Sequence, residues 1–103
     1  MAGLGKFLKQ AQKMQEQMQR VQDDLAQREV EGSAGGGAVK AMARCDGTIA
    51  AIKIDPRVMA AGDVEMLEDL VLGAVTNALE IAKKTQAEEM NKITAGMNLP
   101  GIM

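Results

Sequence analysis

The chain contains no His, Trp or Tyr, and its 103 residues include only one Phe and one Cys. His is the commonest general base and the commonest metal ligand, so its absence argues against acid–base catalysis and against a metal site. Proteins that bind single-stranded nucleic acid usually stack bases on aromatic rings, and this chain offers no such platform. We therefore expect no catalytic residues, no cofactor, no metal and no small-molecule substrate.

The sequence also lacks the features of a membrane or secreted protein. The lone Cys45 has no partner for an internal disulfide, and we expect it as a small buried residue in a reducing cytosol. No apolar run approaches the roughly 20 residues of a membrane span, and the first residues lack the apolar stretch of a signal peptide. We expect a cytoplasmic protein with no membrane partner.

The length predicts a single domain, residues 1–103, with a thin core that a second copy of the chain would enlarge. Nine Met stand where aromatic residues are missing. Clustered and exposed Met would suggest a copper site, but these recur at helical core spacing. We therefore expect them to fill gaps between helices.

An apolar seam with the spacing 4-3-4-3-4 runs through a Gln-rich segment near the N-terminus. Its members are Phe7, Ala11, Met14, Met18, Val21 and Leu25, and Leu4 extends it backwards by one step. This is the a/d pattern of a coiled coil, so we predict a helix over residues 5–28 whose seam needs a partner surface. We interpret the seam as the interface of a homodimer.

Cations gather on the opposite flank of the same predicted helix, in a basic stripe. Its members are Lys6, Lys9, Lys13 and Arg20. The whole chain has a net charge of −2, yet residues 1–28 hold five cations against three carboxylates. A solvated helix surface would look the same, and the alternative is a stripe that neutralises the phosphates of duplex DNA.

Residues 29–55 have the pattern of a small antiparallel sheet. Residues 29–31 alternate as in a short strand, and the Gly-rich segment 32–37 is a loop that lacks the Lys-Ser/Thr of a nucleotide-binding loop. Asp46-Gly47 is a two-residue hairpin signal. Taken literally, it pairs Cys45 with Thr48, and the pairing continues outward to Val39 with Ile54.

This register divides the hairpin into two faces. The face that includes Val39, Ala41 and Ala43 is apolar and should meet the helices. The other face places Lys40 opposite Lys53, which is unfavourable. Either a Glu of the neighbouring strand (Glu29 or Glu31) offsets the repulsion, or an anionic ligand does.

A second helix is predicted over residues 63–93, with Asp63 as its N-cap. Its broad apolar face has a 3.6-residue period, as expected of a core helix: Leu67, Leu70, Val71, Ala74, Val75, Ala78, Ile81 and Ala82. Asp55-Pro56 ends the preceding strand, and a short connection covers residues 57–62. The tail, residues 94–103, contains Gly96, Pro100 and Gly101 and is expected to be non-regular.

Several segments keep one order along nearly the whole chain: GLG at 3–5, KQAQKMQEQM at 9–18, GSAGGGAVK at 32–40, IDP at 54–56, EMLEDL at 65–70, AVTNA at 74–78 and TAGMNLPG at 94–101. Together they resemble the YbaB/EbfC family of bacterial nucleoid-associated proteins. The resemblance implies an α-β-β-β-α protomer and a tweezer-like homodimer with protruding helices. It also implies a DNA-binding protein that organises the nucleoid and affects gene expression.

We therefore predict an α+β fold with a small antiparallel sheet and two long helices. Our leading hypothesis is a dimeric, non-enzymatic protein that binds duplex DNA through phosphate contacts with weak sequence preference. The candidate DNA-binding residues are the basic stripe first, and Lys40, Arg44 and Lys53 second. The alternative is an adaptor or holdase whose Met-rich helices grip another protein.

Overall fold

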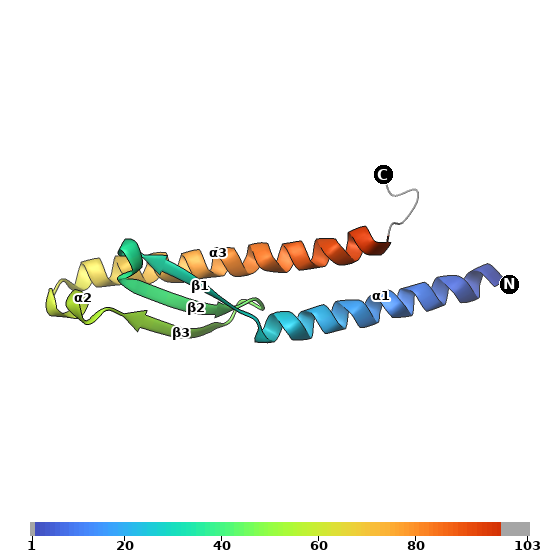
Figure 1. Ribbon diagram of the computed structural model, residues 1–103, viewed down its shortest axis with the longest axis horizontal. Coiled ribbons are helices and arrows are strands. Elements are labelled where there is room, and N and C mark those ends of the chain that lie inside the picture. The colour runs from blue at the N-terminus through green and yellow to red at the C-terminus, as the bar shows by residue number, and fades with distance from the viewer. Residues whose placement is uncertain (1, 98–103) are drawn as a thin grey trace.

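The α-β-β-β-α order predicted from the sequence is confirmed. The computed structural model describes the backbone of residues 2–97 and the side chains of residues 3–93 (Figure 1). Its elements are α1 (Ala2–Gln27), β1 (Glu29–Ala34), the short 3₁₀ turn η1 (Gly35–Gly37), β2 (Val39–Arg44), β3 (Ile49–Ile54), α2 (Pro56–Ala60) and α3 (Val64–Met97). The strands form one antiparallel sheet in the order β1-β2-β3.

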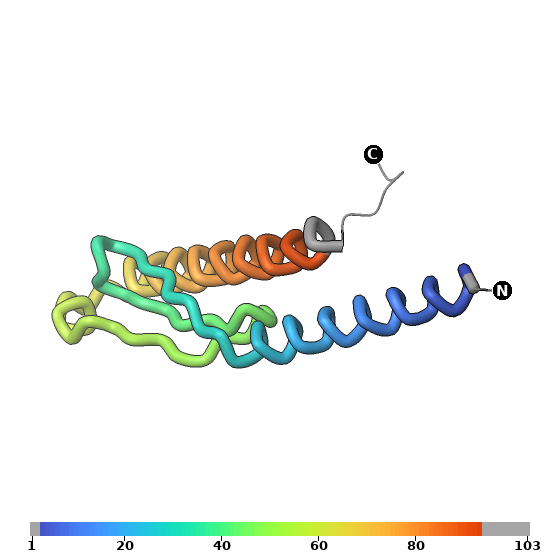
Figure 2. Tube along the Cα trace, turned by 45° about the vertical axis from the view of Figure 1, so that its right-hand side comes forward, coloured from blue at the N-terminus to red at the C-terminus, as the bar shows by residue number. Residues whose placement is uncertain are grey.

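The protomer is long and thin. Its extents are 72 × 25 × 16 Å and its radius of gyration is 20.0 Å, whereas a compact domain of this length has about 13 Å. α3 runs across the sheet and past its edge, and α1 projects from the same edge to the same side, with its chain running antiparallel to α3 (Figure 1). A second view shows the outer part of α1 without a neighbour (Figure 2). Much of the helical surface is therefore not covered by the protomer itself.

The core lies between α3 and the first two strands. Val39, Ala41 and Ala43 on the predicted apolar face of β2 are fully buried, which confirms that assignment. They meet a stripe of buried small residues on α3, formed by Ala74, Ala78 and Ala82. Small side chains on both surfaces let the helix approach the sheet closely, so this thin core is filled without aromatic residues.

Gly32 marks the closest approach of helix and sheet. A Cβ atom at this position would overlap the backbone of Ala78 and the carbonyl oxygen of Ala74. Beside it, the backbone N–H of Ser33 donates to Oδ1 of Asn77 at 3.1 Å. The Gly-rich segment that we expected only as a loop therefore begins inside β1, where the absence of a side chain is a packing requirement.

The helices cover the third strand less than the sequence analysis predicted. α3 packs over β1 and β2 and contacts β3 only slightly, so Ile52, which should have met a helix, keeps 44% of its surface exposed. One helix about 10 Å wide cannot cover three strands spaced about 4.8 Å apart when it is centred on the first two. The apolar face of β3 is therefore left partly exposed.

The hairpin prediction was correct in its outer part and wrong at the turn. The N–H of Arg44 donates to the carbonyl of Thr48, so the loop holds three residues, Cys45 to Gly47, rather than two. Gly47 has φ +96°, as a three-residue hairpin loop requires. Ala43 then pairs with Ile49 instead of Ala50, and a bulge at Ala50 restores the predicted pairs from Met42–Ala51 outward.

The opposed lysines are confirmed, and so is the simpler way to offset them. Lys40 lies opposite Lys53 in the register, and its Nζ is 3.8 Å from Oε1 of Glu31 on β1. Both side chains are about half exposed, so the ion pair contributes at most about 1 kcal/mol. A bound anion is not required to explain this surface.

The connection before α3 contains a helix that the sequence analysis missed. Asp55 caps α2: its Oδ1 accepts from the N–H of Arg57 at 2.9 Å, and its Oδ2 lies 2.8 Å from the Arg57 guanidinium. The bonds from the Arg57 side chain and N–H hold the pKa of Asp55 at about 2. Asp63 caps α3 as predicted, accepting from the N–H of Met66 at 3.0 Å.

Both long helices extend beyond their expected limits. α1 begins at Ala2 instead of residue 5, and α3 continues to Met97, past the expected end at residue 93. A single Gly in a helix costs only about 1 kcal/mol, so Gly96 does not stop α3, and no Pro occurs between residues 64 and 97. The rest of the tail, residues 98–103, lies outside the described residues.

Candidate functional site

The basic stripe lies along the solvent-exposed side of α1. Its four cations are all exposed, and a helical rise of 1.5 Å per residue spreads them over about 21 Å from Lys6 to Arg20. With 100° between successive residues, the stripe is centred on the side of α1 opposite the seam. The structure therefore brings together the four residues that the sequence analysis selected first.

No carboxylate forms an ion pair with the stripe in the described part of the chain. The ion pairs found among residues 3–93 involve Arg28, Lys40, Arg57 and Lys92, and none includes a stripe cation. The first acidic residue of α1 is Glu16, so its first four turns carry Lys6, Lys9 and Lys13 without a negative charge. This segment can accept phosphates without first breaking an internal salt bridge.

The second set of candidate cations occupies a different surface. Lys40, Arg44 and Lys53 share the face of the sheet that α3 does not cover, as the predicted alternation required. Two carboxylates share it: Glu31 pairs with Lys40, and Glu29 lies opposite Arg44 in the register. This face is therefore a mixed surface and a weaker anion site than the stripe.

The outer turns of α3 are electrostatically mixed as well. Oε1 of Glu89 accepts from Nζ of Lys92 and from Nη1 of Arg28, each at 3.1 Å. These two hydrogen bonds, from Lys92 and then Arg28, lower the pKa of Glu89. The Arg28–Glu89 bridge ties the end of α1 to α3 across 61 positions, and no local pattern in the sequence could have indicated it.

The seam is divided into two parts. Leu25 at its inner end is 1% exposed because α1 contacts α3 and β2 there, so it belongs to the protomer core and is not available to a second copy. Met14, Met18 and Val21 are half-buried, whereas Ala11 and Leu4 are exposed and Phe7 keeps 67% of its surface exposed. Only the outer part of the predicted interface remains free.

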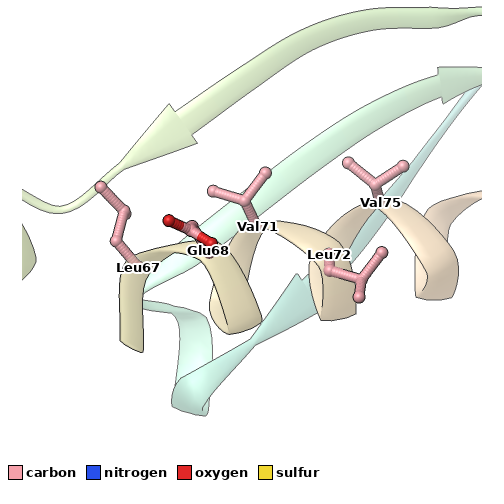
Figure 3. Close-up of a pocket in the computed structure, with 5 residues that line it drawn as sticks. All are labelled: Leu67, Glu68, Val71, Leu72 and Val75. Carbon is pink, nitrogen blue, oxygen red and sulfur yellow. The ribbon is translucent and has the colours of Figure 1, made fainter. Parts of the chain in front are cut away.

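A second, largely apolar surface on α3, which we call the α3/β3 groove, was missed by the sequence analysis, and its lining residues are Leu67, Glu68, Val71, Leu72 and Val75. Leu67, Val71 and Val75 project from α3 on the side of the strands, and Leu72 projects away from them (Figure 3). Leu72 keeps 66% of its surface exposed. The available signal was Leu72 itself, which widens the apolar face of α3 beyond what the sheet can cover.

Other kinds of site would show in the side-chain chemistry of the described residues. Residues 3–93 contain no group of three or more metal-binding side chains, and none of the helices described could span a membrane. Cys45 is buried, and burial raises the pKa of its thiol, which makes it a poor nucleophile.

Comparisons with known proteins show the family of this chain. Residues 1–97 match the model of the YbaB/EbfC DNA-binding family. A nucleoid-associated protein of Caldanaerobacter subterraneus is 48% identical over 99 residues, which cover 96% of this chain and 89% of that protein. A nucleoid-associated protein of Clostridium novyi is 48% identical over 96% of this chain and 87% of its own length.

The fold also occurs in a solved structure. An uncharacterized protein from Helicobacter pylori superimposes with a TM-score of 0.61 at 18% sequence identity, and the match covers 94% of this chain and 95% of that one. At this identity, the likeness supports the α-β-β-β-α architecture alone.

Proposed function

This chain belongs to the YbaB/EbfC DNA-binding family, and we propose that it is a non-enzymatic, nucleoid-associated protein that binds duplex DNA as a homodimer. It would contact phosphates through the basic stripe, with weak sequence preference, and so contribute to nucleoid organisation and gene regulation. The observation that carries the proposal is the cationic outer half of α1, whose lysines have no carboxylate partner among the described residues.

A phosphate-binding mode follows from the residues that the stripe contains. Lys is a flexible point charge without the bidentate geometry that reads a guanine edge, so three lysines position a protein on DNA without identifying bases. Each phosphate that is neutralised releases condensed counterions. A homodimer would carry two stripes on one rigid body, and the second stripe would bind at a high effective concentration.

The homodimer is supported by the surface that one protomer leaves uncovered. The α3/β3 groove on α3 and the exposed Ile52 on β3 are apolar surfaces that one protomer leaves uncovered. A second copy related by a twofold axis would present the same surfaces in return. We therefore place the core dimer at this groove rather than at the inner seam, where Leu25 is already buried.

We predict that Leu72→Glu converts the dimer to monomers. Because Leu72 is exposed in the protomer, the charge would not disturb the protomer core, but it would be buried in the dimer without a partner. The dissociation constant should rise by about a hundredfold or more, measured by sedimentation equilibrium. Ala87→Glu, which adds the same charge at another exposed position of α3, is the control; equal dissociation in both variants would contradict this interface.

The proposed function is tested by measuring duplex binding over a salt series. With three to six lysine–phosphate contacts per dimer, a plot of log K against log salt should have a slope between about −3 and −5. Random and fixed duplexes should bind alike. An affinity that does not change with salt would exclude the phosphate mode. Absence of binding at low salt would favour the alternative, a protein-interaction adaptor with Met-rich helices.

A further inference from the structure

We propose that the free half of α1, residues 2–17, pairs in antiparallel orientation with the same segment of a second core dimer, and that this pairing bridges two DNA duplexes. The self-association rests on the seam alone. The bridging step rests in addition on the proposed DNA-binding function. The inference adds a second contact between copies, distinct from the α3/β3 groove, and a consequence for DNA.

The free half of α1 extends beyond anything that could cover it within the described chain. Arg28 at the end of α1 is bonded to Glu89, and α3 continues only to Met97, about 12 Å further. The two helices run in opposite directions, so α3 ends beside about residue 20 of α1. The first four turns of α1 project past this point (Figure 2), with Leu4, Phe7 and Leu8 exposed at the tip.

The spacing of the exposed residues indicates that their partner is a helix. Leu4 and Ala11 occupy a positions of a heptad, and Phe7 and Met14 occupy d positions. Such a narrow seam matches the knobs-into-holes surface of another helix, whereas a sheet or a flat protein surface would favour a broader stripe.

The residues on both flanks of the seam indicate that the partner is the same helix of a second copy of the chain. In a coiled coil the e and g positions face each other across the interface, and equal charges there would repel in a homotypic pair. In the free half these positions hold Leu8, Gln10, Gln15 and Gln17, none of which is charged. The lysines of the stripe occupy c and f positions on the outer side. Two copies of this cationic helix can therefore pair without bringing their charges together.

Side-chain volume selects the antiparallel orientation. In a parallel pair, Phe7 would face Phe7 and Ala11 would face Ala11, which crowds one layer and leaves a void in the next. In an antiparallel pair centred between these residues, Phe7 faces Ala11 in two layers, and Leu4 faces Met14 in the other two. The large Phe7 then lies opposite the small Ala11, and Leu4 and Met14 are similar in size, so no layer holds two Phe or two Ala side chains.

This arrangement places the basic stripes on opposite outer sides of the helix pair. Each side carries Lys6, Lys9 and Lys13 of one copy, so two duplexes can bind without competing for the same cations. Two heptads form a weak coiled coil in isolation. We therefore expect pairing to depend on protein concentration and to be favoured where many copies lie along the same DNA.

The test measures self-association and bridging separately. The variant Leu4→Gln/Phe7→Gln removes seam contacts at two residues that are exposed in the protomer, and it leaves every charge unchanged. The control, Met59→Gln/Val64→Gln, makes the same kind of change at exposed residues of the opposite end. Self-association without DNA is measured by sedimentation velocity up to millimolar protein. Bridging is measured by capture of a fluorescent duplex on beads that carry a second duplex.

We expect the seam variant to lose tetramer formation and second-duplex capture by at least about tenfold, and to keep the affinity for a single duplex. The control should keep all three. Phe7→Ala should weaken capture, and Phe7→Ala/Ala11→Phe should restore it, because the exchange preserves the large-against-small layers.

Three outcomes would overturn the inference: unchanged capture by the seam variant, an equal loss of single-duplex binding, which would show that the tip contacts DNA, and absence of rescue by the exchange. Failure of the proposed function looks different. In that case the wild-type chain would not bind DNA at any salt concentration, although its concentration-dependent self-association would still respond to the seam variant.

Discussion

Replacing Lys6, Lys9 and Lys13 with Glu should lower the affinity for duplex DNA by at least about a hundredfold at low salt. The three lysines lie on the exposed side of α1, and none has a carboxylate partner among the described residues. Reversal of their charge removes three phosphate contacts from each protomer and adds repulsion. Fluorescence anisotropy across a salt series should show both a lower affinity and a flatter salt dependence.

A matched variant separates this site from a general effect of charge. Lys83, Lys84 and Lys92 are also exposed, and their replacement by Glu changes the net charge by the same amount. Because Lys92 is already engaged with Glu89 and acidic residues surround this part of α3, we expect a loss of less than about tenfold. Equal losses in the two variants would contradict the assignment of DNA binding to α1.

The same pair of variants tests the alternative function. An adaptor or holdase would hold its partner through the Met-rich apolar surfaces, and its binding would depend little on salt or on the stripe. Retained protein capture by the α1 variant, together with lost DNA binding, would assign separate surfaces to the two activities.

Replacement of Gly32 by Ala should destabilise the fold more than any other single-methyl addition in the described chain. The new Cβ would overlap the backbone of Ala78, which cannot move away as a flexible side chain could. α3 would have to shift from the sheet, and the Ala-lined core would open. We expect a loss of at least about 3 kcal/mol, which corresponds to a decrease in Tm of more than about 10 °C by circular dichroism.

Gly5→Ala is the control for this prediction. It adds the same atom in α1, where no other group lies within 4 Å of the new Cβ, and Ala favours the helix by about 1 kcal/mol. Its Tm should be unchanged or slightly raised. If Gly32→Ala were equally harmless, the close packing of α3 on β1 would be wrong.

The hairpin shows which features of the structure local sequence patterns can predict. Asp46-Gly47 and the alternation of residues 38–54 predicted the outer register, because a strand with one buried face tolerates only even shifts. They did not predict the three-residue loop or the bulge at Ala50. The extra residue in the loop and the extra residue in the bulge shift the register by one residue in opposite directions. The pairs from Met42–Ala51 outward are therefore the ones predicted.

The helix ends show the same contrast between features that depend on local interactions, which the sequence predicts, and features that do not. The cap at Asp63 was predictable because a carboxylate that accepts from the first turn is a local interaction. The continuation of α3 to Met97 was not, because Gly96 is a weak stop.

The sequence by itself determined the two long helices, the strands, the seam and the stripe, because periodicity and charge on a helix or strand depend on neighbours a few residues apart. The tertiary structure decided which part of each surface is used. α3 covers two strands of three, so Ile52 remains exposed, and the bridge from Arg28 to Glu89 joins the end of α1 to α3. The inner end of the seam at Leu25 is therefore buried within the protomer, and the tip that carries Phe7 and the lysines has no neighbour among the described residues.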